Sequence, residues 1–257
     1  MIILDIETRP REDLVERYIK PLEAFNPDAV KYGNTKDAGK RAALLDSKKA
    51  EHDDASALHL TKAKAKAALD PLTAEIVVIG VNGSESSPCE GEFFFEGTEE
   101  EILTEFWDLW RSGESTKDEM ISWSGNASSD CFDPMMILRR SWMLDIKTPS
   151  QVVNGRYLGN RWVDASSRYL VGKYGSYCSL TRAADELGLF LGTDELRLSR
   201  KSDNDIVTGK DFHLWYDGKV PNLNDSHAST AEHQRALALS YLSNDLRLLQ
   251  GIVDRIY

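Results

Sequence analysis

Short apolar runs bounded by turn-forming residues predict several strands. The run after Met1 ends before Thr8, so we expect a buried strand over residues 1–7. Residues 75–81, Glu-Ile-Val-Val-Ile-Gly-Val, give the strongest strand signal in the chain because β-branched residues dominate them. Further strands are expected at 92–95, 120–123 and 161–164.

Apolar residues at steps of three and four predict helices between and after these strands. Thr98 and Glu101 have capping-box spacing at the start of a helix expected over 98–110. The last helix is the clearest, because a capping-box pattern at Ser229 and Glu232 precedes a leucine-rich stripe with the same steps. Shorter helices are expected at 134–142, 166–171 and 179–187.

The segment 12–69 has a different character from the rest of the chain. Residues 36–68 are rich in Ala, Leu and Lys without a clean apolar stripe, which indicates one or two exposed helices in a solvated insertion. The alternative is a basic flap in which Lys62, Lys64 and Lys66 contact a substrate. On a helix Lys62 and Lys66 share a face that Lys64 does not, which weakens this alternative.

The order of the elements indicates one mixed α/β domain over residues 1–257, with a helical insertion at 12–69 after the first strand. A chain of 257 residues with 41% hydrophobic and 28% charged residues has a globular composition and can bury a core.

No apolar run approaches the roughly 18 to 20 residues that span a bilayer, and the first residues lack the features of a signal peptide. Three widely spaced cysteines form no metal-binding pair or disulfide framework. We therefore expect a cytoplasmic protein without membrane contact.

The formal net charge of −11 argues against a protein that holds nucleic acid by bulk positive charge. It does not exclude an enzyme with a local basic groove and bound cations, because carboxylates that chelate cations add negative charge to the bare sequence.

Two pairs of residues have spacings that favour shared chemistry. Asp5 and Glu7 lie two apart on the first predicted strand, so their carboxylates point to one face and repel each other unless they are protonated or share a cation. Oxygen ligands favour Mg²⁺ or Mn²⁺. Tyr241 and Asp245 lie four apart on one face of the last helix. Taken alone, each pair is better explained by solvated side chains than by a shared site.

A third segment links a strand, a Gly-Asn turn and a helix. It contains Asn126 and Asp130 and ends at Phe132-Asp133 before a helix that carries Arg139 and Arg140. Asp133 alone is equally compatible with a plain helix cap.

Together the three segments resemble the three motifs of the DEDD superfamily of 3′–5′ exonucleases, which have a ribonuclease H-like fold: a mixed sheet flanked by helices. The motifs are Leu4-Asp-Ile-Glu-Thr, the segment from Asn126 to Asp133, and Tyr241-Leu-Ser-Asn-Asp, which is the tyrosine version because position 240 is Ser rather than His. The most similar subgroup is the exonuclease domain of family-B DNA polymerases, here without a polymerase. Two departures stand out: Ala127–Cys131 lengthen the second motif, which makes Asp130 the rival of Asp133, and the insertion at 12–69 follows the first motif.

The resemblance implies two-metal hydrolysis of the last phosphodiester bond at a DNA 3′ end, single-stranded or frayed, with release of nucleoside monophosphates. Asp5, Glu7, Asp133 and Asp245 would hold two Mg²⁺ or Mn²⁺ ions, and Tyr241 would orient the attacking water. Asn126, Arg139 and Arg140 are the expected substrate contacts. Partners would be DNA in preference to RNA, and replication or repair proteins.

Three alternatives remain at this stage. The same chemistry on RNA would make the chain a 3′–5′ exoribonuclease, and no residue in the sequence is assigned to the 2′-hydroxyl. A catalytically silent ribonuclease H-like module that binds nucleic acid would have no need for the repelling pair Asp5 and Glu7. An aspartyl-phosphate phosphatase would require Asp at position 7, where this chain has Glu.

Overall fold

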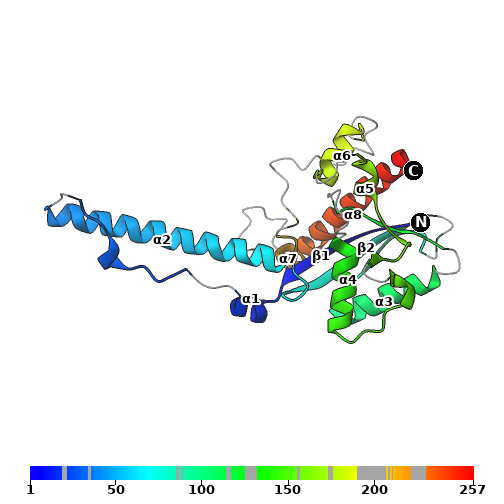
Figure 1. Ribbon diagram of the computed structural model, residues 1–257, viewed down its shortest axis with the longest axis horizontal. Helices are drawn as coiled ribbons and strands as arrows, with labels where there is room; N and C mark the ends of the chain where they lie inside the picture. The colour runs from blue at the N-terminus through cyan, green and yellow to red at the C-terminus, as the bar shows by residue number, and fades with distance from the viewer. Residues whose placement is uncertain are drawn as a thin grey trace. The chain divides into compact units, whose positions relative to one another are not determined.

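The computed structural model (Figure 1) divides the chain into two compact units, Met1–Arg9 with Glu75–Tyr257, and Pro10–Ala74. The residues that it describes are 1–18, 22–33, 36–84, 87, 89–113, 117–124, 132–154, 157–172, 176–189, 207, 209, 211–220 and 230–257. The strands are β1 Ile2–Pro10, β2 Ala74–Gly83, β3 Gly91–Phe95, β4 Met120–Ser122, β5 Val153–Asn154, β6 Tyr157–Leu158 and β7 Trp162–Asp164. The α-helices are α1 Glu12–Tyr18, α2 Ala38–Ala67, α3 Glu99–Ser112, α4 Phe132–Met143, α5 Ala165–Tyr169, α6 Leu180–Glu186, α7 Phe212–Tyr216 and α8 Ala231–Ile256. Short 3₁₀ turns lie at Pro27–Ala29 and Ser150–Val152.

The first unit is built around a mixed sheet with the strand order β3-β2-β1-β4-β7. β1 runs parallel to β4, and β4 runs parallel to β7, whereas β2 and β3 are antiparallel. The chain is thus an α/β protein with helices beside a mixed sheet, as the pattern of elements predicts. β5 and β6 form a separate two-stranded ribbon.

Helices α8 and α3 cover opposite faces of this sheet (Figure 1). On the face under α8, buried Ile3 and Ile121 pack with Leu246 and Leu249. The neighbouring pair in the β4–β7 register, Met120 and Trp162, points the other way, where the Trp162 ring stacks on Phe106 of α3 with centroids 6.0 Å apart. Because alternate residues of a strand share a face, the side of β1 that carries Ile3 also carries positions 5, 7 and 9.

The last helix begins one residue later than the capping pattern predicts. Thr230 is the N-cap of α8 and its hydroxyl accepts a hydrogen bond from the backbone N–H of His233. Ser229 lies outside the described residues. The other predicted cap is confirmed, because Thr98 and Glu101 form a capping box at the start of α3.

The second unit consists largely of α2, a single helix of 30 residues where the sequence leaves one or two helices open. Ala67 is its buried residue, which accords with the absence of an apolar stripe. The ring of Phe25 contacts His52 at a centroid distance of 5.6 Å, and Nζ of Lys64 pairs with the Glu12 carboxylate at 2.8 Å. The range predicted for a helical insertion, 12–69, lies within this unit.

Among the described residues, the helices include none with both the length and the apolar composition that a membrane span needs.

Candidate metal site

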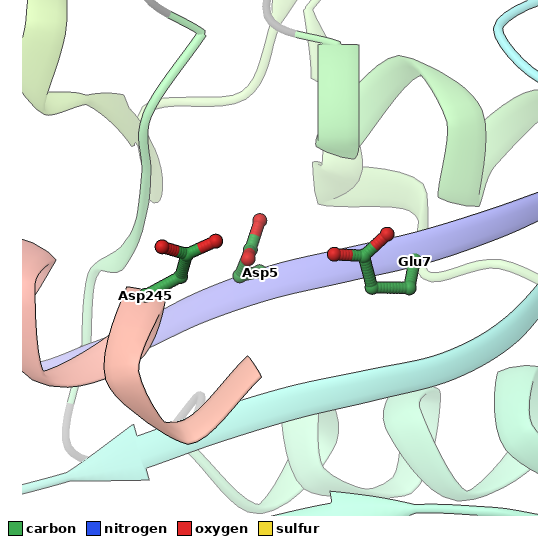
Figure 2. A group of neighbouring side chains, drawn as sticks. All are labelled: Asp5, Glu7 and Asp245. Atoms are coloured by element: carbon green, nitrogen blue, oxygen red, sulfur yellow. The ribbon is translucent and has the colours of Figure 1, made fainter. Parts of the chain in front are cut away.

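Three carboxylates from the two ends of the chain meet on the α8 side of the sheet. Asp5 and Glu7 project from β1, and Asp245 approaches from α8 (Figure 2). Ligand oxygens of the three side chains all lie within 4.8 Å of one another. The two-residue spacing on a strand accounts for the first pair, and the packing of α8 across β1 brings in the third.

Close packing between α8 and the sheet fixes the position of Asp245. Its helical neighbours Leu242 and Leu246 are fully buried, and Leu246 packs with Ile3 of β1. Gly80 of β2 allows this approach, because a Cβ atom at that position would lie 2.9 Å from Cδ1 of Leu246. The helix therefore presents Asp245 to the strand that carries the other two acids.

The environment of the three acids fits a hard divalent cation. Glu7 and Asp245 are only 8% and 9% exposed, and Asp5 is half-buried. Poor hydration strengthens the repulsion between carboxylates unless they bind protons or share a cation. An all-carboxylate donor set suits Mg²⁺ or Mn²⁺ rather than a softer metal.

Asp133 lies near this group but is not one of its three members. It sits in the first turn of α4, which begins at Phe132 and not at Pro134 as predicted, and its side chain is buried. Burial raises the pKa of Asp133 well above its ordinary value, and the negative charges of Asp5 and Asp164 raise it further. The fourth predicted acid is therefore electrostatically coupled to the site. Its rival Asp130 and the predicted substrate contact Asn126 lie outside the described residues.

Tyr241 joins the site through Asp245, four residues further along α8. The two side chains are hydrogen-bonded, with the phenol as donor to the carboxylate. Burial raises the pKa of Tyr241 above its usual value, and the negative charges of Asp245, Glu7 and Asp5 add to this effect. The phenol is therefore protonated at neutral pH and donates its hydrogen bond to Asp245.

The two predicted arginine contacts have different environments. Arg139 is exposed on α4, whereas Arg140 is 1% exposed and pairs with Glu99 through Nε–Oε1 at 2.8 Å and Nη2–Oε2 at 2.5 Å. Oε1 of Glu99 also accepts the backbone N–H of Ile76 at 2.8 Å. This buried ion pair joins α4, α3 and β2, so the Arg140 guanidinium is committed to the fold and not exposed to a strand of nucleic acid.

Asp164 belongs to the surroundings of the site and was missed by the sequence analysis. This buried residue ends β7, and its carboxylate accepts hydrogen bonds from Ser124 Oγ at 2.6 Å and from Ser166 N and Oγ at 3.0 and 2.7 Å. An Asp before Ala-Ser-Ser at a strand end is a recognisable N-cap signal, and Asp164 caps α5. Its proximity to Asp133 has no signal in the local sequence.

Comparison of the chain with protein-family models, with curated proteins and with solved structures gives no match.

Proposed function

We propose that the chain is a metal-dependent 3′–5′ exonuclease that hydrolyses the terminal phosphodiester bond of DNA at single-stranded or frayed 3′ ends. The observation that carries the proposal is the meeting of Asp5, Glu7 and Asp245 within 4.8 Å. These acids come from the first and last motifs of the resemblance, which are separated by nearly the whole chain. Chance acids in an acidic chain have no reason to converge in this way.

The fold and the tyrosine support the same proposal. A mixed sheet flanked by helices is the architecture that the resemblance implies, and we propose the ribonuclease H-like fold for the first unit. Tyr241, which distinguishes the tyrosine version of the third motif, is hydrogen-bonded to Asp245. The second-motif acid Asp133 is coupled electrostatically to Asp5.

In this proposal Asp5, Glu7 and Asp245 would hold Mg²⁺ or Mn²⁺, and Asp133 would contribute to a second ion. Bound divalent cations lower the pKa of an attacking water and neutralise charge on the scissile phosphate. Because the single proton of the Tyr241 hydroxyl is donated to Asp245 in a hydrogen bond, Tyr241 would orient the water by accepting a hydrogen bond from it. Glu7 and Asp245, poorly hydrated in the fold, fix the donor atoms before the substrate arrives, which limits reorganisation during the reaction.

DNA is proposed rather than RNA because the motifs are most similar to those of polymerase exonuclease domains. The test is cleavage of a 5′-labelled single-stranded DNA oligomer by the full chain with Mg²⁺, with Mn²⁺ and with chelator, beside the same assay on RNA. Asp5→Asn removes one ligand charge with little change in volume, and Glu105→Gln, an exposed acid of α3, is the matched control.

A ladder that shortens from the 3′ end, requires metal, persists in Glu105→Gln and is lost in Asp5→Asn is the expected result. Cleavage of RNA alone would replace DNA by RNA as the substrate. Cleavage of neither polymer with either metal would refute the proposed activity.

A further inference from the structure

A cleft of about 420 Å³ lies in the first unit beside the end of β1. Its walls come from β1, the start of β2, the turn before α3, the end of α7 and the first turns of α8. The lining residues that matter here are Arg9, Glu75, Thr98, Tyr216, Asp217 and Arg235. The volume falls in the range of small-molecule sites.

The charges of this cleft are paired. Arg9 binds Glu75 through Nε, and its Nη1 donates to both carboxylate oxygens of Asp217 at 3.0 Å. Arg235 binds Oε1 of Glu96 through Nη2 at 2.8 Å. A free anion would have to displace a carboxylate from each guanidinium, and a free cation would have to displace a guanidinium from each carboxylate. The cleft therefore favours a neutral, polar ligand.

One wall of the cleft is a planar stack. The guanidinium of Arg235 lies over the ring of Tyr216, 4.4 Å from its centroid, and Tyr216 stacks on Phe212 with centroids 5.7 Å apart at 18°. The Arg235 side chain is 46% exposed, so the stack has an accessible end. Flat π-systems, nucleobases above all, stack on guanidinium planes and aromatic rings of this kind.

The cleft is a direct neighbour of the candidate metal site. Arg9 shares a face of β1 with Asp5 and Glu7 and follows Glu7 by two residues, a rise of about 6.6 Å along a strand. On the other side, the Phe212 ring of the stack contacts Tyr241 at a centroid distance of 6.2 Å. The cleft and the three carboxylates thus share β1, and the stack in the cleft wall contacts the tyrosine that binds Asp245.

We propose that this cleft binds a nucleobase, stacked on Arg235 and read by the paired polar groups around it. Carboxylates such as Glu75 and Asp217, which line the cleft, are acceptors for the exocyclic amino groups of bases. The source of the base rests on the proposed function: it belongs either to the substrate strand next to the scissile bond or to a free nucleoside monophosphate. Both sources share the chemistry that the cleft recognises.

The test measures binding without cleavage. Fluorescence anisotropy of a 5′-labelled oligodeoxyadenylate is recorded in chelator with the full chain, and single abasic sites replace the bases in turn from the 3′ end. One abasic position is expected to weaken binding to the wild type by about tenfold, the size of one lost base stack. Arg235→Ala and Arg235→Lys should bind the intact strand more weakly and show no further loss at that position, because lysine keeps the charge but not the plane.

Arg247→Ala is the matched control, since Arg247 is an exposed arginine of the same helix that does not line the cleft. It should retain the wild-type abasic penalty. Adenosine and adenosine 5′-monophosphate serve as competitors, to test whether the cleft binds a free nucleotide. If they displace the strand from the wild type but not from Arg235→Ala, the cleft binds a free nucleotide. If the abasic site weakens binding but the competitors do not displace the strand, the cleft binds a base of the strand. The proposal is overturned if the abasic site weakens binding equally in the wild type and in Arg235→Ala. It is also overturned if the abasic site has no effect on either protein and neither adenosine nor adenosine 5′-monophosphate displaces the strand.

The two proposals fail separately. If binding in chelator depends on the base but neither Mg²⁺ nor Mn²⁺ supports cleavage, the proposed exonuclease activity is refuted and the proposed base-binding role of the cleft stands. If cleavage requires metal but binding depends neither on the base nor on Arg235, the proposed base-binding role of the cleft is refuted and the proposed exonuclease activity stands.

Discussion

Arg9 and Asp217 lie 208 residues apart in the sequence, and Nη1 of Arg9 donates to both carboxylate oxygens of Asp217 at 3.0 Å. Asp217 is the C-cap of α7, the helix whose Phe212 ring contacts Tyr241. The strand that carries Asp5 and Glu7 is thereby tied to the helix that supports the tyrosine.

The ion pair between Arg9 and Asp217 should give a measurable coupling energy. We expect Arg9→Ala and Asp217→Ala each to lower the free energy of unfolding, and the double variant to lose less than the sum by roughly 0.5–3 kcal/mol. The Arg9 side chain is 36% exposed, so solvent screening places the value toward the lower end. A double-mutant cycle in urea measures it, and strict additivity of the two losses would show that the pair contributes nothing.

The three-carboxylate group should make the protein's stability depend on divalent cations. A cation that binds only the folded chain stabilises it by about 2.7 kcal/mol when its free concentration is a hundred times its dissociation constant. We expect Mg²⁺ or Mn²⁺ to raise the melting temperature by several degrees relative to chelator. Asp5→Asn should raise the melting temperature in chelator, because it relieves repulsion, and should abolish most of the shift with metal. The control Glu105→Gln should match the wild type in both conditions, and an equal shift in Asp5→Asn would contradict the site.

Arg140 and Arg139 are adjacent but should differ sharply in their effect on stability. Arg140→Ala leaves the buried Glu99 carboxylate without its guanidinium, which typically costs roughly 3–5 kcal/mol. Arg139→Ala removes an exposed side chain and should change the free energy of unfolding by less than about 0.5 kcal/mol. Equilibrium denaturation of both variants provides the comparison. Similar values for the two would mean that the ion pair adds nothing to the fold.

His213 on α7 should make stability fall in mild acid. Burial lowers the pKa of His213; Arg9 and Lys219 lower it further, and Asp217 and Asp211 oppose this change. Since the folded state has the lower pKa, the unfolded chain takes up the proton first as the pH falls below about 6.5, and the free energy of unfolding decreases. His213→Gln should remove this part of the dependence while matching the wild type at pH 8. Melting temperatures across this range test the prediction, and identical profiles of the two proteins would refute it.

The parts of the site with local signals were predictable from the sequence. The two-residue spacing of Asp5 and Glu7 and the four-residue spacing of Tyr241 and Asp245 give each pair a common face once strand and helix are recognised. The contact between the two pairs is not local, and only the order of the motifs indicated it. The paired charges of the cleft, such as Arg9 with Asp217, had no signal, because each partner alone has the sequence context of a solvated residue.

Burial was less predictable for residues at the edges of helices. Trp162 and Trp142 each have an apolar neighbour in the sequence, but Trp162 is 7% exposed and Trp142 is 52% exposed. Trp142 lies near the end of α4, where its indole Nε1 donates to Thr148 Oγ1 at 3.3 Å on the surface. Arg140, two residues earlier, is instead buried by its pairing with Glu99. The local apolar pattern does not distinguish buried Arg140 from exposed Trp142, because the burial of Arg140 depends on Glu99, which is distant in the sequence.

Gly80 should be intolerant of even one added carbon, because it sets the distance between β2 and α8. A Cβ atom there would lie 2.9 Å from Cδ1 of Leu246 and 3.1 Å from Cγ and Cδ2 of Leu242, both fully buried, so these side chains and the helix that carries them would have to shift. Gly80→Ala should therefore lower the free energy of unfolding by roughly 1–3 kcal/mol, the usual cost of overpacking. Combined with Leu246→Ala, it should cost less than the sum of the single changes, since the methyl group would occupy part of the space that leucine leaves. Because the same movement would draw Asp245 away from Asp5, Gly80→Ala should also reduce the rise in melting temperature that divalent cations produce. Normal cation-dependent stabilisation in a destabilised Gly80→Ala protein would show that the position of α8 on the sheet is not what assembles the three carboxylates.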